Sequence, residues 1–359
     1  MPPTPPGLPT LSPLILGGAG FSSQLTSTPH SLPAVPILLR AFSLGLLTID
    51  TSPYYHPSEE ILGAALQDPA ITSRYRREDY VLMTKAGRIA ADHFDYSPAW
   101  IRTSVERSLG RFGTGYLDVV FCHDVEYISL EEGVGAVGTL LELKDQGVIR
   151  AAGISGYDLP KIKAVAKEVQ RRYGRGVDVV QNWAQLTLQN TRLETEGLRE
   201  LREAGVWAVC ASSPLACGLL RDGGVPVGAL GDWHPAPEGL RERSREAARV
   251  VRESGESLPG VALRFAIRRA VENTKGDLVV STITGIGSLE DLEENAAAAR
   301  QVLGDGILGD AGAAAKKAGE VEGGDKRLQE KDEVLFKKVR EVLGDWIDYD
   351  FSTPKDAET

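Results

Sequence analysis

The amino-acid sequence predicts an α/β fold, a (β/α)8 TIM barrel with a long loop after the seventh strand and additional C-terminal helices. Short runs of apolar, often β-branched residues alternate along the chain with longer amphipathic stretches. Eight such runs occur, and most lie about 30 residues apart, which is the size of one βα unit. The runs are apolar almost throughout, as expected of parallel strands that are buried on both faces. Eight units of this kind favour a closed barrel over an open doubly wound sheet.

The strand candidates are short apolar runs bounded by glycine or polar residues. They are Leu14–Leu16, Leu47–Asp50, Tyr80–Thr84, Leu117–Cys122, Ile149–Ile154, Val177–Gln181, Trp207–Ala211 and Leu278–Ile283. The stretches between them carry signals of helix ends. Ser97-Pro98 supplies an N-cap and a residue suited to the first helical position, and Ser58-Glu59-Glu60 places two carboxylates in a first turn. Gly147 and Gly205 stand where helices must stop before a strand.

The longest interruption of this alternation is Leu219–Lys275, between the seventh and eighth strand candidates. Its first part, Arg221–Pro237, is rich in glycine and proline and is expected to form a loop. Its second part carries two helical patterns, Glu238–Ser254 and Leu258–Arg269. Long loops are often functional, so we expect this one to project over the mouth of the barrel.

A second interruption covers residues 304–325, a run of Gly, Ala, Asp and Lys with almost no large apolar side chain. Such a segment cannot bury enough apolar surface to order itself, so a flexible insertion is expected here. A helical pattern over Lys326–Leu343 follows the insertion. We therefore expect residues 1–359 to form a single barrel domain that carries this insertion.

Composition argues against several classes of function. The chain has 359 residues and a formal net charge of −10, so it lacks the basic surface that nucleic-acid binding requires. The start MPPTPPGLPT lacks both regions of a signal peptide, and no apolar run approaches the roughly 18 residues of a membrane span. Cys122, Cys210 and Cys217 form neither a CxxC pair nor a zinc spacing, so no metal site is expected. We expect a cytoplasmic protein with small-molecule partners, and no apolar stripe indicates an oligomeric state.

Ionisable residues gather at the ends of the second, third and fourth strand candidates. Asp50 ends the second, Tyr55 follows five residues later, Lys85 follows the third and His123 follows the fourth. The C-terminal ends of the strands in a parallel barrel form one rim, where catalytic side chains lie. Each residue alone has an ordinary alternative: Lys85 as a surface residue, His123 as a satisfied core histidine, Asp50 as a helix cap.

The four side chains nevertheless complement one another chemically. A phenol has a pKa near 10 and is a poor base at neutral pH, whereas a buried ammonium beside it favours the phenolate and lowers that pKa. The ammonium in turn needs a carboxylate to remain charged when it is buried. We therefore predict that Asp50, Lys85 and Tyr55 act together, with His123 hydrogen-bonded to the reacting oxygen, and that these four residues are catalytic.

A series of motifs around these residues is typical of one family. The motifs are DTSPYYHPSEEILG (Asp50–Gly63), MTKAG (Met83–Gly87), YLDVVFCHD (Tyr116–Asp124), GISGYD (Gly153–Asp158), VVQNW (Val179–Trp183), SPLACGLL (Ser213–Leu220) and GIGSLEDLEENAAA (Gly285–Ala298). They span nearly the whole barrel and resemble the aldo-keto reductase superfamily, in which the matching Asp, Tyr, Lys and His form a catalytic tetrad. CHDVEY, SPLACGLL and DWHPA resemble more narrowly the branch that contains plant L-galactose dehydrogenase and fungal NAD-dependent D-arabinose 1-dehydrogenase.

The resemblance implies a nicotinamide cofactor bound at the same rim. The residues implied in binding it are Gly18, Ala19, Gly20, Ser155, Gly156, Gln181, Ser213, Pro214, Leu215, Gly218, Gly285, Ser288, Asp291, Glu294 and Asn295. NADP-dependent members carry basic residues after the eighth strand, but here Gly285–Asp291 contains no Lys or Arg and ends in Glu290 and Asp291. A carboxylate repels a 2′-phosphate and can accept a hydrogen bond from a free ribose hydroxyl. NAD is therefore the expected cofactor, with NADP disfavoured, even if both acids also stabilise the first turn of a helix.

The chain departs from the family pattern near the nicotinamide. Gly156 replaces the common Asn, and Ser212 stands where many members have a Tyr that stacks on the nicotinamide. Trp183 is a candidate for that stacking, with ordinary core packing as its alternative. Trp233 and His234, in the loop after the seventh strand, are predicted to form a sugar-facing wall, with anchoring of the loop as their alternative. Trp183, Trp233 and His234 are thus the candidates for substrate binding.

One leading hypothesis and two alternatives follow. The leading hypothesis is oxidation of the C1 hydroxyl of an aldose, of the D-arabinose or L-galactose type, to an aldonolactone with NAD+. The first alternative is an NADPH-dependent carbonyl or aldehyde reductase that uses the same four residues in the opposite direction. The second is a non-catalytic barrel subunit, which the complete set of four catalytic residues argues against.

Overall fold

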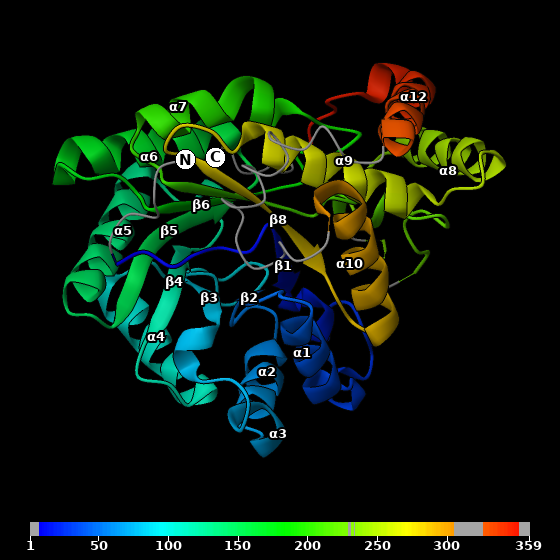
Figure 1. Cartoon of the computed structure of the whole chain (residues 1–359). Helices are drawn as coiled ribbons and strands as arrows, with labels where there is room; N and C mark the ends of the chain where they lie inside the picture. The colour runs from blue at the N-terminus through cyan, green and yellow to red at the C-terminus, as the bar shows by residue number, and fades with distance from the viewer. Residues whose placement is uncertain (1–6, 229–230, 233, 305–325, 352–359) are drawn as a thin grey trace.

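A computed structural model of the chain describes residues 7–228, 231–232, 234–304 and 326–351, and within them eight parallel strands close into one barrel (Figure 1). Consecutive strands pair with one another, and β8 pairs with β1 to close the ring. The strands are β1 (Leu14–Gly17), β2 (Thr48–Asp50), β3 (Val81–Ala86), β4 (Leu117–Cys122), β5 (Ile149–Gly156), β6 (Val179–Trp183), β7 (Ala208–Ser212) and β8 (Val279–Gly285). The predicted barrel is confirmed, and each strand overlaps its candidate with ends displaced by at most two residues.

Helices follow the strands, and most of them surround the barrel (Figure 1). They are α1 (Ala34–Ser43), α2 (Ser58–Leu66), α3 (Pro69–Thr72), α4 (Pro98–Phe112), α5 (Leu130–Asp145), α6 (Leu159–Tyr173), α7 (Leu198–Glu203), α8 (Glu238–Glu253), α9 (Leu258–Asn273), α10 (Leu289–Leu303) and α12 (Lys326–Leu343). The expected cap is present, since Ser97 Oγ accepts a hydrogen bond from the Trp100 N–H at 3.3 Å. Gly147 and Gly205 adopt φ angles of 76° and 78° just beyond α5 and α7, which confirms them as helix stops. The helical patterns after β7 and near the C-terminus are confirmed as α8, α9 and α12.

Side chains along each strand alternate between the barrel interior and the layer of helices. On β4, Val119 and Phe121 belong to an interior cluster, whereas Val120 belongs to the core between strands and helices. On β3, Met83 belongs to the interior cluster, so Lys85 two residues later faces the interior as well. The same alternation brings a polar side chain to the interior near the ends of five strands: Asp50, Lys85, His123, Ser155 and Gln181.

The N-terminal end of the barrel is closed by the residues that precede β1. Leu11 is 2% exposed and packs in the interior cluster, with Leu8 against it. The N–H of Ser12 donates to Thr48 Oγ1 at 3.0 Å, and Ser12 Oγ accepts from the Leu47 N–H at 3.2 Å. This irregular segment therefore fills one end of the barrel and leaves the other end, where the strands terminate, for the site.

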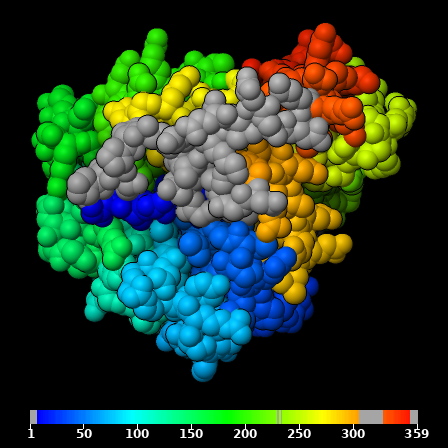
Figure 2. All heavy atoms as spheres, viewed as in Figure 1, coloured from blue at the N-terminus to red at the C-terminus, as the bar shows by residue number. Residues whose placement is uncertain are grey.

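The C-terminal part of the chain packs beside α8 and α9 and then returns to the barrel mouth. Figures 1 and 2 show α12 seated next to α8 at one edge of the molecule. The two buried side chains of Arg264 on α9 and Asp332 on α12 form an ion pair with an Nη2–Oδ1 distance of 2.7 Å. Further on, the Phe351 N–H donates to the hydroxyl of Tyr157 at 2.7 Å. Because Tyr157 directly follows β5, this contact brings the segment after α12 to the rim of the barrel.

Two expectations concern residues that are not described. The insertion expected at 304–325 lies, apart from Gly304, outside the described residues, and so does Trp233. Within the described ranges, none of the helices combines the length and apolar character that crossing a membrane requires.

Candidate active site

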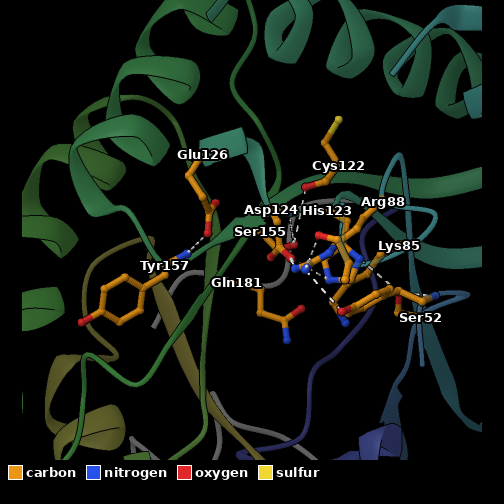
Figure 3. A network of polar contacts seen from close by, with 12 residues as sticks. Ser52, Lys85, Arg88, Cys122, His123, Asp124, Glu126, Ser155, Tyr157 and Gln181 are labelled. Atoms are coloured by element: carbon orange, nitrogen blue, oxygen red, sulfur yellow. Dashed lines mark hydrogen bonds and ion pairs between the residues drawn. The ribbon is translucent and has the colours of Figure 1, made fainter. Parts of the chain in front are cut away.

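The four predicted catalytic residues come from three consecutive strand ends and lie close together. Asp50 is the last residue of β2, Lys85 lies one residue before the end of β3, and His123 directly follows β4. Tyr55 lies in the loop between β2 and α2. Figure 3 shows Lys85 and His123 converging near Ser52 and Arg88 at this rim.

Lys85 and Asp50 form a buried ion pair. Lys85 Nζ lies 2.9 Å from both carboxylate oxygens of Asp50 and 2.9 Å from the carbonyl oxygen of Thr51, so its three protons have three acceptors. The two residues are 2% and 3% exposed. Burial raises the pKa of the Asp50 carboxyl, while the charge of Lys85 opposes that rise. Gln181 Nε2 adds a further contact to Asp50 Oδ2 at 3.3 Å.

Tyr55 lies against this pair and against His123. The centre of its ring is 5.0 Å from Lys85 Nζ and 5.8 Å from the His123 ring, to which it is nearly perpendicular at 89°. Burial raises the pKa of Tyr55 well above 10, and the charges of Asp50 and Asp124 raise it further. The net shift is therefore upward and not downward as the sequence indicated, because burial and the two carboxylates outweigh the positive charge of Lys85, which is itself paired with Asp50.

His123 is held in its neutral form. Burial lowers its pKa to about 3, so the imidazole is uncharged at neutral pH. Its Nδ1 lies 3.1 Å from Ser52 Oγ, which also accepts a hydrogen bond from the Tyr54 N–H. The Ser52 hydroxyl can therefore donate to Nδ1, which leaves the proton on Nε2.

Sequence reasoning missed a second ion pair beside His123. Arg88 Nη1 donates to Asp124 Oδ2 at 2.5 Å, and the same oxygen lies 3.5 Å from His123 Nε2. Arg88 Nη2 also donates to the hydroxyl of Tyr54 at 3.3 Å. Asp124 is the last residue of the motif that contains His123, and Arg88 directly follows the motif that contains Lys85. This proximity in the sequence to two predicted catalytic residues was the signal that could have identified the pair.

The ends of β5 and β6 carry the residues expected to hold the nicotinamide. Ser155 and Gln181 are paired in register on these two strands. The side-chain oxygens of Gln181 and Asn182 are buried and accept no hydrogen bond from the described residues. Buried acceptors of this kind need donors, and the amide group of a nicotinamide supplies them. The residues present therefore fit the expected cofactor.

Gly156 has a reason of its own to be glycine. A Cβ at this position would lie 2.1 Å from Glu126 Oε2, so the carboxyl of Glu126 occupies the space that the common Asn would need. Glu126 Oε1 also accepts a hydrogen bond from the Tyr157 N–H at 2.8 Å, as drawn in Figure 3. Burial and the charge of Asp124 raise the pKa of Glu126 to about 8.

The segment between β8 and α10 is organised around Asp291. Ser288 is the N-cap of α10 and accepts from the Asp291 N–H at 3.0 Å, and Asp291 Oδ2 accepts from the Gly287 N–H at 3.0 Å. Asp291 therefore lies in the first turn of α10, as its alternative role proposed, while its exposed carboxylate also places a negative charge where an adenine ribose is expected. Asn295 Nδ2 lies 3.4 Å from Gly285 O, and Glu294 is exposed.

Two further loops contain the remaining cofactor candidates. Gly18–Phe21, which includes Ala19 and Gly20, forms a short 3-10 helix against α2 and the loop after β8. A Cβ on Gly20 would lie 2.5 Å from the carbonyl oxygen of Ile286, so close backbone packing requires glycine there. The loop Ser213–Gly218, with Pro214 and Leu215, follows β7 and has left-handed backbone at several positions.

Two of the three substrate candidates, Trp183 and His234, are among the described residues, and they lie in different environments. Trp183 ends β6, and its ring is half-buried with its centre 4.5 Å from that of Tyr157. His234 is 3% exposed; its Nε2 lies 3.0 Å from Ala216 O, and its Nδ1 accepts from the Ala236 N–H at 3.1 Å. These contacts tie the loop after β7 together, so the geometry of His234 fits the anchoring alternative. A direct contact with substrate stays a prediction for both residues.

Comparisons with known proteins agree with this architecture. The model of the aldo/keto reductase family matches residues 13–306. D-arabinose 1-dehydrogenase of Saccharomyces cerevisiae is 38% identical over 288 residues, which are 80% of this chain and 82% of that protein. L-galactose dehydrogenase of Arabidopsis thaliana is 32% identical over 272 residues, which are 75% of this chain and 78% of that protein.

A solved structure shows the same fold. An aldo-keto reductase of Bacillus halodurans in its holo form matches with a TM-score of 0.58 and 24% identity, over 86% of this chain and 92% of that chain. The closed barrel, the family match and the two curated relatives all lead to the same assignment. The chain belongs to the aldo/keto reductase family, whose enzymes are oxidoreductases that use nicotinamide cofactors.

Proposed function

We propose that this oxidoreductase transfers hydride from C1 of an aldose to NAD+ and releases an aldonolactone. The observation that carries the proposal is the buried Asp50–Lys85 ion pair packed against Tyr55, with the ring of the neutral His123 also beside the phenol ring. The names of the two relatives, D-arabinose 1-dehydrogenase and L-galactose dehydrogenase, support a pentose or hexose of these types as the substrate.

Each of the four residues has a separate role at the reacting carbon. Tyr55 takes the proton of the C1 hydroxyl as the general base. His123 donates its Nε2 proton to the same oxygen, because the neutral imidazole keeps that proton while Nδ1 accepts from Ser52. The charge of Lys85 stabilises the phenolate that must form on Tyr55, and Asp50 keeps Lys85 charged in its buried position.

The cofactor supplies the hydride acceptor, and this chain supplies its position. Ser155 and Gln181 would hold the amide of the nicotinamide, with Trp183 as the candidate that stacks on its ring. The rest of the cofactor would lie close to the backbone at the glycines, which have no side chain in the way, and beside two serines. The glycines are Gly18, Gly20, Gly156, Gly218 and Gly285, and the serines are Ser213 and Ser288. Asp291 would accept a hydrogen bond from the adenine ribose.

Oxidation rates are expected to rise with pH through the alkaline range. Tyr55 can accept a proton only as the phenolate, and burial holds its pKa well above 10. Below that pKa the phenolate fraction grows about tenfold per pH unit. His123 adds no step near neutrality because its pKa is about 3. The measurement is kcat/KM for the sugar against pH, and a plateau that begins below about pH 9 would contradict a Tyr55 base with a raised pKa.

The second candidate function is reduction of a carbonyl by NADPH. The same four residues could perform it, because the protonated phenol of Tyr55 can donate its proton to the carbonyl oxygen. The two directions respond differently to pH, because reduction uses the protonated phenol that burial favours. Initial rates for a panel of aldoses with NAD+ and NADP+, and for simple aldehydes with NADPH, separate them. Efficient reduction of simple aldehydes by NADPH without aldose oxidation would replace the proposal.

Cofactor preference is expected to depend on Asp291. The wild-type enzyme should prefer NAD+, and Asp291→Arg should move the ratio of the two kcat/KM values toward NADP+ by about 10- to 100-fold, the usual effect of a hydrogen bond to a charged group. Asp291→Asn is the matched control, since it removes the charge but can still accept from the Gly287 N–H. It should move the ratio less than the arginine does. A wild-type preference for NADP+ would overturn the assignment of NAD.

A further inference from the structure

The Arg88–Asp124 pair lies where a substrate bound to His123 would meet it. Ser52 engages Nδ1 of His123, so Nε2 is the nitrogen available to the reacting oxygen. Asp124 Oδ2 lies 3.5 Å from that Nε2. The Asp124 N–H lies 3.4 Å from Ser155 Oγ, so the pair also borders the place expected for the nicotinamide, as Figure 3 shows.

One donor and one acceptor of this pair have no partner among the described residues. The guanidinium of Arg88 has five N–H groups. Four of them are used, by Ala90 O at 3.4 Å, Asp124 Oδ2 at 2.5 Å, the Tyr54 hydroxyl at 3.3 Å and Ala91 O at 3.2 Å. The remaining N–H is on Nη1, beside Asp124. Asp124 Oδ1 accepts no hydrogen bond within the described ranges, and the side chains of Arg88 and Asp124 keep 15% and 9% of their surface exposed.

The pair is also held in a fixed orientation. The guanidinium carbon of Arg88 lies 4.1 Å from the centre of the Tyr54 ring, 5.2 Å from that of Tyr127 and 5.4 Å from that of Phe94. Asp124 has left-handed backbone with φ of 48°, a conformation that Asp and Asn tolerate better than most residues. A fixed donor and acceptor side by side suit a hydroxyl group, which can accept one hydrogen bond and donate another.

We propose that Asp124 and Arg88 bind the hydroxyl on the carbon next to the reacting carbon, and so select α-hydroxylated substrates. This hydroxyl donates to Asp124 Oδ1 and accepts from Arg88 Nη1, while the reacting oxygen lies at His123 Nε2. The assignment rests on the proposed function, in which that group is the C2 hydroxyl of an aldose. It gives the enzyme a reason to prefer sugars over simple alcohols and aldehydes.

The test compares an aldose with its 2-deoxy analogue in the wild type and in Asp124→Asn. The wild type should prefer the aldose by about 10- to 100-fold in kcat/KM, as expected for a hydrogen bond to a charged group. Asp124→Asn should lose most of that preference because its turnover of the aldose falls, while turnover of the 2-deoxy sugar changes little. The Kd of NAD+, measured by quenching of tryptophan fluorescence, should stay unchanged in the variant. Glu142→Gln, which removes a carboxylate from an exposed ion pair with Arg102, is the control for net charge.

Three results would overturn this assignment. The first is a wild type that does not distinguish the two sugars, and the second is an Asp124→Asn variant that keeps the full preference. The third is an equal loss on both sugars, which would show that the pair only supports the fold of the rim. If the wild type oxidises no aldose, the proposed function fails. The hydroxyl site can then still be tested in the direction of reduction, by the ratio of kcat/KM for glyceraldehyde, which has the α-hydroxyl, to kcat/KM for propanal, which lacks it.

Discussion

Tyr55→Phe is expected to lower kcat for sugar oxidation at least about 100-fold, because it removes the general base and leaves the ring in place. The phenyl ring can still pack 5.0 Å from Lys85 Nζ and against His123, so the fold of the rim should survive. NAD+ binding should therefore stay close to that of the wild type. The measurement is kcat at saturating sugar and cofactor, together with the Kd of NAD+.

The matched control is Tyr75→Phe, which removes a phenol hydroxyl from a ring that packs edge-on against Phe42, away from the site. It should leave kcat unchanged. A Tyr55→Phe variant that turns over within a few-fold of the wild type would show that another group takes the proton. A variant that also loses NAD+ binding would point to a structural role for the hydroxyl.

The sequence predicted the barrel and the placement of these side chains because both follow from repeats of residue type over a few positions along the chain. Alternation along the strands directs Lys85 and His123 into the interior, and parallel pairing puts their strand ends at one rim. The helix caps could be predicted for a similar reason, since Ser97 and Gly147 act on backbone groups only a few residues away. These features depend on local geometry, which the order of residue types determines.

What could not be predicted depends on how loops meet. Arg88 reaches Asp124 across two loops, and no periodic pattern encodes that contact. His234 lies in the Gly/Pro-rich loop after β7, and the sequence left open whether it faces the sugar or anchors this loop; its buried ring contacts Ala216 O in the same loop, a contact that no periodic pattern encodes. The pKa of Tyr55 was misjudged for a related reason. The sequence indicated that Lys85 and Asp50 would pair beside Tyr55, but not that Thr51 would take the third proton of Lys85 or that burial would dominate the pKa of Tyr55.

The Lys85–Asp50 pair leads to the largest expected effect on stability. Lys85→Met leaves the Asp50 carboxylate buried with only the Gln181 amide at 3.3 Å, and breaking a buried pair on one side costs about 3–5 kcal/mol. The variant also loses the charge that stabilises the phenolate of Tyr55, so sugar oxidation should slow and its controlling pKa should rise. Both effects are measurable, the first by urea unfolding and the second by the pH profile of kcat/KM.

Combining Lys85→Met with Asp50→Asn separates these two effects. The double variant has no uncompensated buried charge, so it should recover a large part of the lost free energy of unfolding, and the coupling between the two positions should be well above zero. Catalysis should not recover, because no cation remains beside Tyr55. Recovery of activity together with stability would mean that Lys85 contributes only to folding. If the single and double variants are equally destabilised, the two side chains do not depend on each other as their shared burial and 2.9 Å contacts indicate.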